Sequence, residues 1–166
     1  LHNSFPITPV NTLPGAHLIK KFKKIHKINS ELCVGMVGRI NLNRKGQDIF
    51  IKSAALLKNK FPKVKFIIVG SPFPGKEYYL KKINDVIESY NLHDNILLIG
   101  EIRNIILAYS IFDVVVIPST RPESFGNVGF EAMNSMKPLI ASNLGGVKDQ
   151  IIEGETGFFY DNYNYH

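Results

Sequence analysis

Short apolar runs alternate with longer amphipathic stretches along most of the chain. Runs of apolar and β-branched residues are typical of buried strands, and they occur at residues 32–37, 66–69, 96–99, 114–117, 139–141 and 158–160. Between them, apolar residues recur every three or four positions, as on the buried side of a helix, at residues 46–59, 77–90, 103–110 and 126–135. This alternation predicts an α/β fold in which helices cover both faces of a parallel, Rossmann-like sheet.

The beginning of the chain shows no such pattern. Prolines interrupt residues 1–19, and a lysine-rich stretch follows before the first expected strand. We therefore expect residues 1–31 to form a linker or hinge segment and residues 32–166 to form a single domain, since 166 residues suffice for one core.

Composition excludes several functional classes. The hydrophobic content of 45% and the charged content of 20% are ordinary for a globular domain, and no apolar run is long enough to span a membrane. Cys33 lies alone in an apolar run, where we expect it to be buried and reduced, in a cytoplasmic protein. Gly35, Gly38 and Gly46 lack the G-x-G-x-x-G spacing of a dinucleotide site, so NAD is not expected.

The net charge of +6 has an identifiable source. Five lysines gather before the first expected strand, at Lys20, Lys21, Lys23, Lys24 and Lys27. Such a run is usually a solvated face, and the alternative is attraction to an anionic membrane surface or to nucleic acid. No motif that combines aromatic and basic residues accompanies the run, so nucleic acid is not an expected partner.

The apolar run at 114–117 leads into a loop and then a helix. Backbone amides at residues 126–128, near the start of this helix, would face the crevice beyond the carboxyl end of the strand, where phosphates bind favourably. Glu123 lies in the loop and Glu131 lies about one turn into the helix. The stretch therefore predicts a site for a polar ligand.

The spacing of these two glutamates is informative. Seven residues separate them, Phe125-Gly126 follows the first, and Ala132-Met133 follows the second. With Pro138-Leu139-Ile140-Ala141 downstream, the pattern resembles the Glu-x7-Glu signature of retaining glycosyltransferases of the group 1, glycogen synthase-like family. That family has the GT-B architecture of two Rossmann-like domains, and the signature lies in the C-terminal domain, which binds the nucleotide-sugar donor. The resemblance covers residues 33–160.

A second element of the family is similar as well. Gly38-Arg39 ends the first expected strand, and Lys45-Gly46 opens the next helix. The resemblance implies that Arg39 and Lys45 bind the donor diphosphate, whose leaving group gains negative charge as the glycosidic bond breaks. Two cations can neutralise this charge without a metal. The alternative interpretation is a solvated basic loop.

The resemblance also assigns roles to the two glutamates. Glu131 would accept hydrogen bonds from both ribose hydroxyls, and Glu123 would orient the donor sugar. Ile102 would contact the base. Alternatively, both glutamates are surface charges favoured by a helix N-terminus. The expected site has Arg39, Lys45 and Glu123 in catalytic roles, and its remaining binding residues are Gly38, Ile102, Phe125, Gly126, Asn127, Val128 and Glu131.

Two residues depart from the family pattern. Met136 stands where a glycine usually ends this helix, so that helix end must differ or strain a non-glycine residue. Asp149 replaces a glutamate that usually follows the pair Gly145-Gly146. Neither position is expected to touch the phosphates or the ribose.

The resemblance implies an enzyme of the glycosyltransferase class that uses a nucleoside-diphosphate sugar and needs neither cofactor nor metal. We expect the chain to be a fragment without the N-terminal, acceptor-binding domain and the closing helices, so it should bind the donor without catalysing transfer. The alternatives are a GT-B epimerase or phosphorylase and a non-catalytic module that binds nucleotide sugars. The sequence leaves the sugar, the base and the acceptor open.

Overall fold

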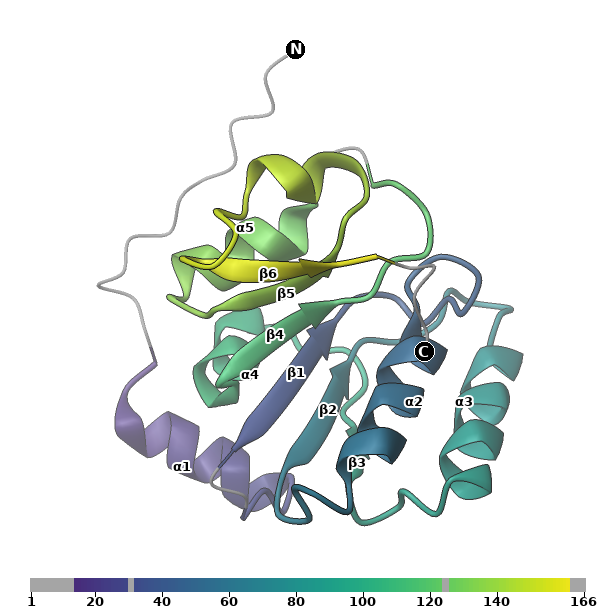
Figure 1. The fold of residues 1–166 in the computed structure, drawn as a ribbon. Helices are drawn as coiled ribbons and strands as arrows, with labels where there is room; N and C mark the ends of the chain where they lie inside the picture. The colour runs from purple at the N-terminus through teal and green to yellow at the C-terminus, as the bar shows by residue number, and fades with distance from the viewer. Residues whose placement is uncertain (1–13, 30–31, 124–125, 162–166) are drawn as a thin grey trace.

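The computed structural model describes residues 14–29, 32–123 and 126–161, and it contains one parallel sheet in the order β3-β2-β1-β4-β5-β6 (Figure 1). The strands are β1 (Cys33–Val37), β2 (Lys65–Val69), β3 (Ile96–Leu98), β4 (Val114–Ile117), β5 (Leu139–Ser142) and β6 (Gly157–Tyr160). The helices are α1 (Ala16–Ile25), α2 (Gln47–Leu57), α3 (Tyr78–Ser89), α4 (Ile105–Ile111) and α5 (Asn127–Asn134), with a 3₁₀ turn η2 (Gly145–Asp149). The expected Rossmann-like fold is confirmed.

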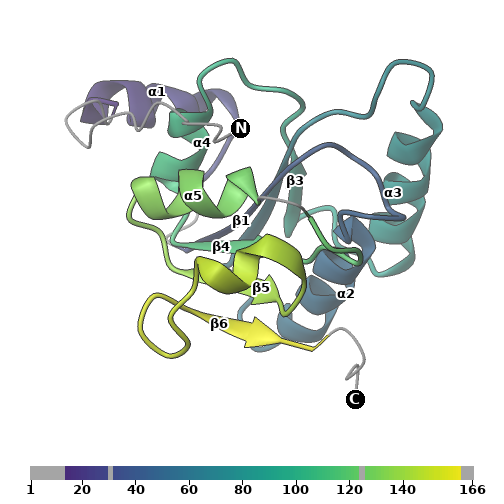
Figure 2. The same ribbon diagram turned by 90° about the horizontal axis from the view of Figure 1, so that it is seen from above.

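The helices form a layer on each face of the sheet. Figure 2 shows α1, α4 and α5 on one face and α2 and α3 on the other. Successive residues of β2 serve the two layers in turn: Phe66 and Ile68 pack with α2 and α3, whereas Ile67 and Val69 pack with α4 and α5. A strand buried on both faces explains why this run is apolar without alternation.

The order of the strands creates a crevice. β1 pairs with β2 on one side and with β4 on the other, so the chain winds outward from β1 in both directions. In an open parallel sheet, the loops that leave the carboxyl ends of two such neighbouring strands diverge and leave room for a ligand. The loops after β1 and β4 are the ones that carry Arg39, Lys45 and Glu123.

Helix α1 is an element that the sequence pattern does not predict. Residues 16–25 lie within the expected linker, yet they form a helix whose Phe22 is buried in the core shared with α4 and α5. Four of the ten residues of α1 are lysines and Phe22 is its one buried residue, so little of the helix marks it as part of the core from sequence. Cys33 is buried as expected, and burial is the main reason why its pKa is raised.

At the C-terminal end of α5, Met136 occupies the position where the family usually has glycine. Met136 has a φ of 55°, in the left-handed region, and its amide donates a 2.8 Å hydrogen bond to Met133 O. The amide of Lys137 donates to Ala132 O over 2.9 Å. These are the hydrogen bonds of a helix end that usually has glycine in the left-handed position. The helix end is therefore of the usual kind, and Met136 is a strained non-glycine residue in it.

Candidate functional site

Two loops at the carboxyl edge of the sheet are locked together by Gly46. This residue has a φ of +70°, and a Cβ built there would lie only 1.8 Å from the carbonyl oxygen of Pro118, which follows β4. The amide of Thr120 donates a 2.8 Å hydrogen bond to Arg44 O, which joins the same two loops a second time. Only glycine satisfies both the backbone conformation and the close approach.

The backbone of Glu123 is held from another direction by the first residues of η2. Gly145 has a φ of +65°, and a Cβ there would approach the backbone oxygen of Glu123 to 2.6 Å. The amide of Gly146 donates to Glu123 O over 3.0 Å. The glycine pair noted in the sequence therefore positions the loop that carries the first glutamate. Phe125, a residue expected in the site, lies outside the described residues.

The side chain of Glu123 forms an ion pair with Lys45. Lys45 Nζ donates to Glu123 Oε1 over 2.8 Å, and 26% and 23% of the two side chains are exposed. The hydroxyl of Ser119, a buried residue, donates to the same oxygen. Burial alone would raise the pKa of Glu123, but the hydrogen bonds from Lys45 and Ser119 and the positive charges of Lys45 and Arg44 outweigh it, so the pKa is lowered. Glu123 is thus a carboxylate at neutral pH.

The structure brings Lys45 next to Gly38, as expected, but it places Arg39 against an aromatic ring. A Cβ at Gly38 would lie 3.8 Å from Lys45 Cδ, so the lysine side chain passes along this turn. Arg39 Cζ lies 3.8 Å from the centroid of the Phe73 ring, a cation–π contact with the loop after β2. Phe73 is exposed, and nothing in its sequence context distinguishes it from an ordinary loop residue.

The backbone at Arg39 is supported by a buried glutamine. Gln47 Nε2 donates to Arg39 O over 2.8 Å, and Gln47 Oε1 accepts from the amide of Asn41 over 3.3 Å. Gln47 is fully buried at the first position of α2, so these bonds satisfy its amide and fix the course of the loop. A polar residue on the apolar side of the expected helix is the signal that could have identified it.

The second glutamate is held by a buried tyrosine. Tyr109 OH donates a 2.8 Å hydrogen bond to Glu131 Oε2, and only 1% of Tyr109 is exposed. Burial raises the pKa of Tyr109 far above its usual range, and the charge and hydrogen bond of Glu131 raise it further. The hydroxyl therefore remains a neutral donor at every physiological pH and orients a carboxylate that is itself exposed. From sequence, Tyr109 is one aromatic residue in an apolar stretch.

The start of α5 lies between the two glutamates. Gly126 has a φ of 67° and directly precedes the helix, which has no side-chain cap at this end. The side chain of Gln150 fills the space beside Gly126 and Gly129: a Cβ at Gly129 would lie 1.9 Å from Gln150 Oε1. The first amides of the helix, at Asn127 and Val128, have no intrahelical acceptor and so can bind an anion.

Ile102 has a different environment. It follows β3 and is half-buried, and it packs against the same core as Val128. This places it on the α5 side of the sheet, and its expected contact with a base stays a prediction. No helix in the described part of the chain is long and apolar enough to cross a bilayer.

The combination of a paired lysine and glutamate, a second oriented glutamate and an uncapped helix start agrees with the family resemblance. A family model described as Glycosyl transferases group 1 matches residues 19–166. The chain belongs to this family of enzymes. Its structural neighbours are GT-B glycosyltransferases.

The chain is similar to longer glycosyltransferases of bacterial surface polysaccharides. It is 34% identical over 144 residues to the capsular polysaccharide biosynthesis glycosyltransferase CapM of Staphylococcus aureus. The matched region covers 84% of this chain and 35% of CapM. It is 30% identical over 145 residues to the lipopolysaccharide core biosynthesis mannosyltransferase LpcC of Rhizobium leguminosarum bv. viciae, covering 87% and 36%. The chain thus spans little more than a third of these curated relatives.

Two solved structures show the same fold. Anabaena HepE in complex with UDP and glucose superimposes with a TM-score of 0.85 at 28% identity, over 97% of this chain and 42% of that one. The C-terminal domain of a group 1 family protein, LpcC of Francisella tularensis, gives a TM-score of 0.77 at 25% identity, over 93% of this chain and 80% of that one.

Proposed function

We propose that this chain is the C-terminal, donor-binding domain of a retaining glycosyltransferase that transfers a sugar from a nucleoside-diphosphate sugar to an acceptor. The observation that carries the proposal is the meeting of Lys45, Glu123 and the start of α5 at one edge of the sheet. The match to a solved C-terminal domain supports the assignment of the domain. The UDP and glucose in the HepE structure support a nucleotide-sugar ligand.

The diphosphate is the part of the ligand that the site fits best. The amides of Asn127 and Val128 would receive the distal phosphate, and Lys45 and Arg39 would balance its charge. Lys45 is already paired with Glu123, so a phosphate would share this ammonium with the carboxylate. Arg39 would either leave the ring of Phe73 or bind while it remains stacked there.

The two carboxylates divide the rest of the donor. Glu131, with one oxygen held by Tyr109, would accept hydrogen bonds from the ribose hydroxyls. Glu123, in the loop that precedes this helix, would accept bonds from the donor sugar. As the bond between sugar and diphosphate breaks, negative charge grows on the diphosphate, where the cations and the helix amides stabilise it. Retention of configuration is an expectation from the family signature.

The proposal is tested by nucleotide titration. We expect UDP, GDP or ADP to shift amide resonances of residues 38–46 and 126–131, with a dissociation constant of about 0.1–1 mM. Binding should survive EDTA, because cations of the protein replace a metal. Glu131→Gln should weaken binding, whereas Glu155→Gln, at an exposed turn, is the matched control and should not.

Three outcomes would contradict the proposal. Absence of binding by all three nucleotides would overturn the donor site, and loss of binding in EDTA would overturn the role of the two cations. Efficient sugar transfer by these 166 residues would overturn the assignment as a donor-binding half, because no acceptor domain would then be needed to position the reactants.

A further inference from the structure

Helix α1 and the turn after it concentrate most of the net charge of the protein. Of the 20 lysines and arginines in the chain, five lie between residues 20 and 27, so the remaining 15 nearly balance the 14 aspartates and glutamates. Residues 14–29 contain no acidic residue. Within the described part of the chain, no ion pair involves these five lysines. The charge is therefore a local property of one surface.

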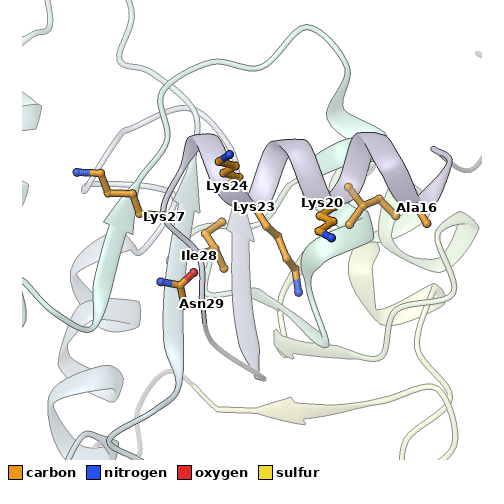
Figure 3. A pocket seen from close by; sticks show the side chains of 8 residues that line it. Ala16, Lys20, Lys23, Lys24, Lys27, Ile28 and Asn29 are labelled. Carbon is orange, nitrogen blue, oxygen red and sulfur yellow. The ribbon is translucent and has the colours of Figure 1, made fainter.

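The lysines surround a groove with an apolar floor. Figure 3 shows the groove beside α1, which has a volume of about 710 Å³. Lys20, Lys23, Lys24 and Lys27 line it together with Ala16, Ile19, Ile28 and Asn29. Positive charges at the rim and aliphatic side chains beneath them fit an amphiphile with an anionic head.

Two exposed apolar residues flank the buried side of α1. Leu18 and Ile25 are seven residues apart and so lie on one side of the helix, where 48% and 63% of their surfaces are exposed. Lys21 and Lys24 are exposed beside them. Phe22 lies between them on the same stripe and is buried against the core, which fixes the helix in this orientation. Leu18 and Ile25 therefore form an exposed apolar margin of α1 next to its lysines, the combination of residues that a membrane interface binds.

We propose that α1 is a docking surface for a membrane that contains anionic phospholipid. The sequence allows two interpretations of the lysines, a solvated face or attraction to anions. The confinement of the charge, the groove and the exposed Leu18 and Ile25 favour the second. A bilayer is favoured over nucleic acid, because the exposed apolar residues of α1 are aliphatic and cannot stack on bases.

Docking through α1 leaves the candidate site accessible. α1 lies near the starting ends of the strands, whereas the loops with Lys45 and Glu123 leave their opposite ends (Figure 1). The inference thus goes beyond the proposed donor site and does not depend on it. A chain that binds no nucleotide could still bind vesicles.

Vesicle sedimentation tests this inference on the whole 166-residue chain. Vesicles of phosphatidylcholine with about one third phosphatidylglycerol should bind the chain, and pure phosphatidylcholine vesicles should bind it weakly or not at all. Added salt should reduce the binding. Lys21→Gln with Lys24→Gln should lower the partition coefficient about 25-fold, since each lysine near an anionic surface contributes about five-fold.

Matched controls separate α1 from overall charge and folding. Lys81→Gln with Lys82→Gln makes the same charge change on α3, on the other face of the sheet, and should alter partitioning about two-fold or less. Leu18→Ser with Ile25→Ser should lower partitioning about ten-fold, whereas Leu56→Ser, at the 84% exposed Leu56 on α2, should not. Circular dichroism confirms that each variant is folded.

Two results would overturn the inference. One is failure of the folded chain to bind anionic vesicles, including the case in which it binds a single-stranded RNA oligonucleotide instead. The other is an equal loss of binding in the α1 and α3 lysine variants, which would mean that charge acts without regard to position.

Discussion

Glu123 and Glu131 reach the same edge of the sheet, but the structure holds them by different means. Glu123 is partly buried in an ion pair with Lys45, 78 residues away, and it receives a second bond from Ser119. Glu131 is exposed and is held by the neutral hydroxyl of Tyr109. The first arrangement depends on charge and on two loops that must meet. The second depends on Tyr109, a core residue of α4, and its hydrogen bond to Glu131 involves neither of the two loops.

This difference suggests a division of tasks. In the proposed function, the carboxylate paired with Lys45 lies beside the diphosphate, where charge would develop during the reaction. A carboxylate held by a neutral donor keeps its geometry, which suits recognition of ribose. Variants that disturb one arrangement and spare the other should therefore produce separable effects.

The largest effect should come from breaking the contact that brings the two loops together. Gly46→Ala places a Cβ 1.8 Å from Pro118 O at a φ of +70°. We expect the free energy of unfolding to fall by about 3 kcal/mol or more, as measured by urea denaturation. Gly75→Ala is the control, because Gly75 has a φ of +77° with nothing within 4 Å.

The Gly75 variant should lose only about 1–2 kcal/mol for its left-handed backbone. The difference between the two variants then isolates the close approach to Pro118. Equal losses would show that backbone conformation alone accounts for Gly46 and that the loops do not depend on this contact.

Lys45→Met should have the next largest effect, on ligand binding. It removes the charge that pairs with Glu123 and that the proposed function assigns to the diphosphate, so nucleoside-diphosphate affinity should fall about 10- to 100-fold by calorimetry. Lys52→Met, in a surface pair with Asp48, is the control and should bind normally. Unchanged affinity in Lys45→Met would remove this lysine from the diphosphate site.

The pH dependence of stability should reveal the charge-dependent arrangement. The pKa of Glu123 is lowered in the folded state, so its contribution to stability is present above the unfolded value near 4.5 and is lost as pH falls through the lower folded value. The difference in thermal midpoint between wild type and Glu123→Gln should therefore shrink below pH 4.5. A difference that grew on acidification would mean that the ion pair is not stabilising.

The smallest effect should come from Tyr109→Phe. This variant keeps the buried ring and removes only the hydroxyl that orients Glu131. Stability should change by about 1 kcal/mol or less, because Glu131 is exposed and water can replace the bond. Affinity for a nucleoside diphosphate should fall a few-fold, while affinity for inorganic pyrophosphate, which lacks ribose, should not change. An equal loss for both ligands would contradict an action through Glu131.

The sequence predicts the strands and most helices because periodic burial is a local property. The apolar run of β2 is continuous because this strand is buried on two faces, and a run of this kind is recognisable without tertiary information. α1 is not predicted because it follows a proline-rich stretch, four of its ten residues are lysines, and Phe22 is its only buried residue.

The candidate site also contains features that a local sequence pattern predicts and features that only the folded chain reveals. The spacing of Glu123 and Glu131 is local, and it correctly indicates a loop followed by a helix start. The pairing of Glu123 with Lys45 depends on the order of the strands, which no local pattern contains. Gln47 and Tyr109 are polar groups in apolar surroundings, and their partners become known only when the chain is folded.

Calorimetric titration of two glutamate variants tests the central claim most directly. The ligands are the nucleoside diphosphate that binds best and its sugar-bearing form. Glu131→Ala should weaken both about 10-fold, because ribose is common to both, whereas Glu123→Ala should weaken mainly the sugar-bearing ligand. Glu155→Ala is the control for lost charge and should bind both normally. Equal losses for the two ligands in both glutamate variants would contradict the account.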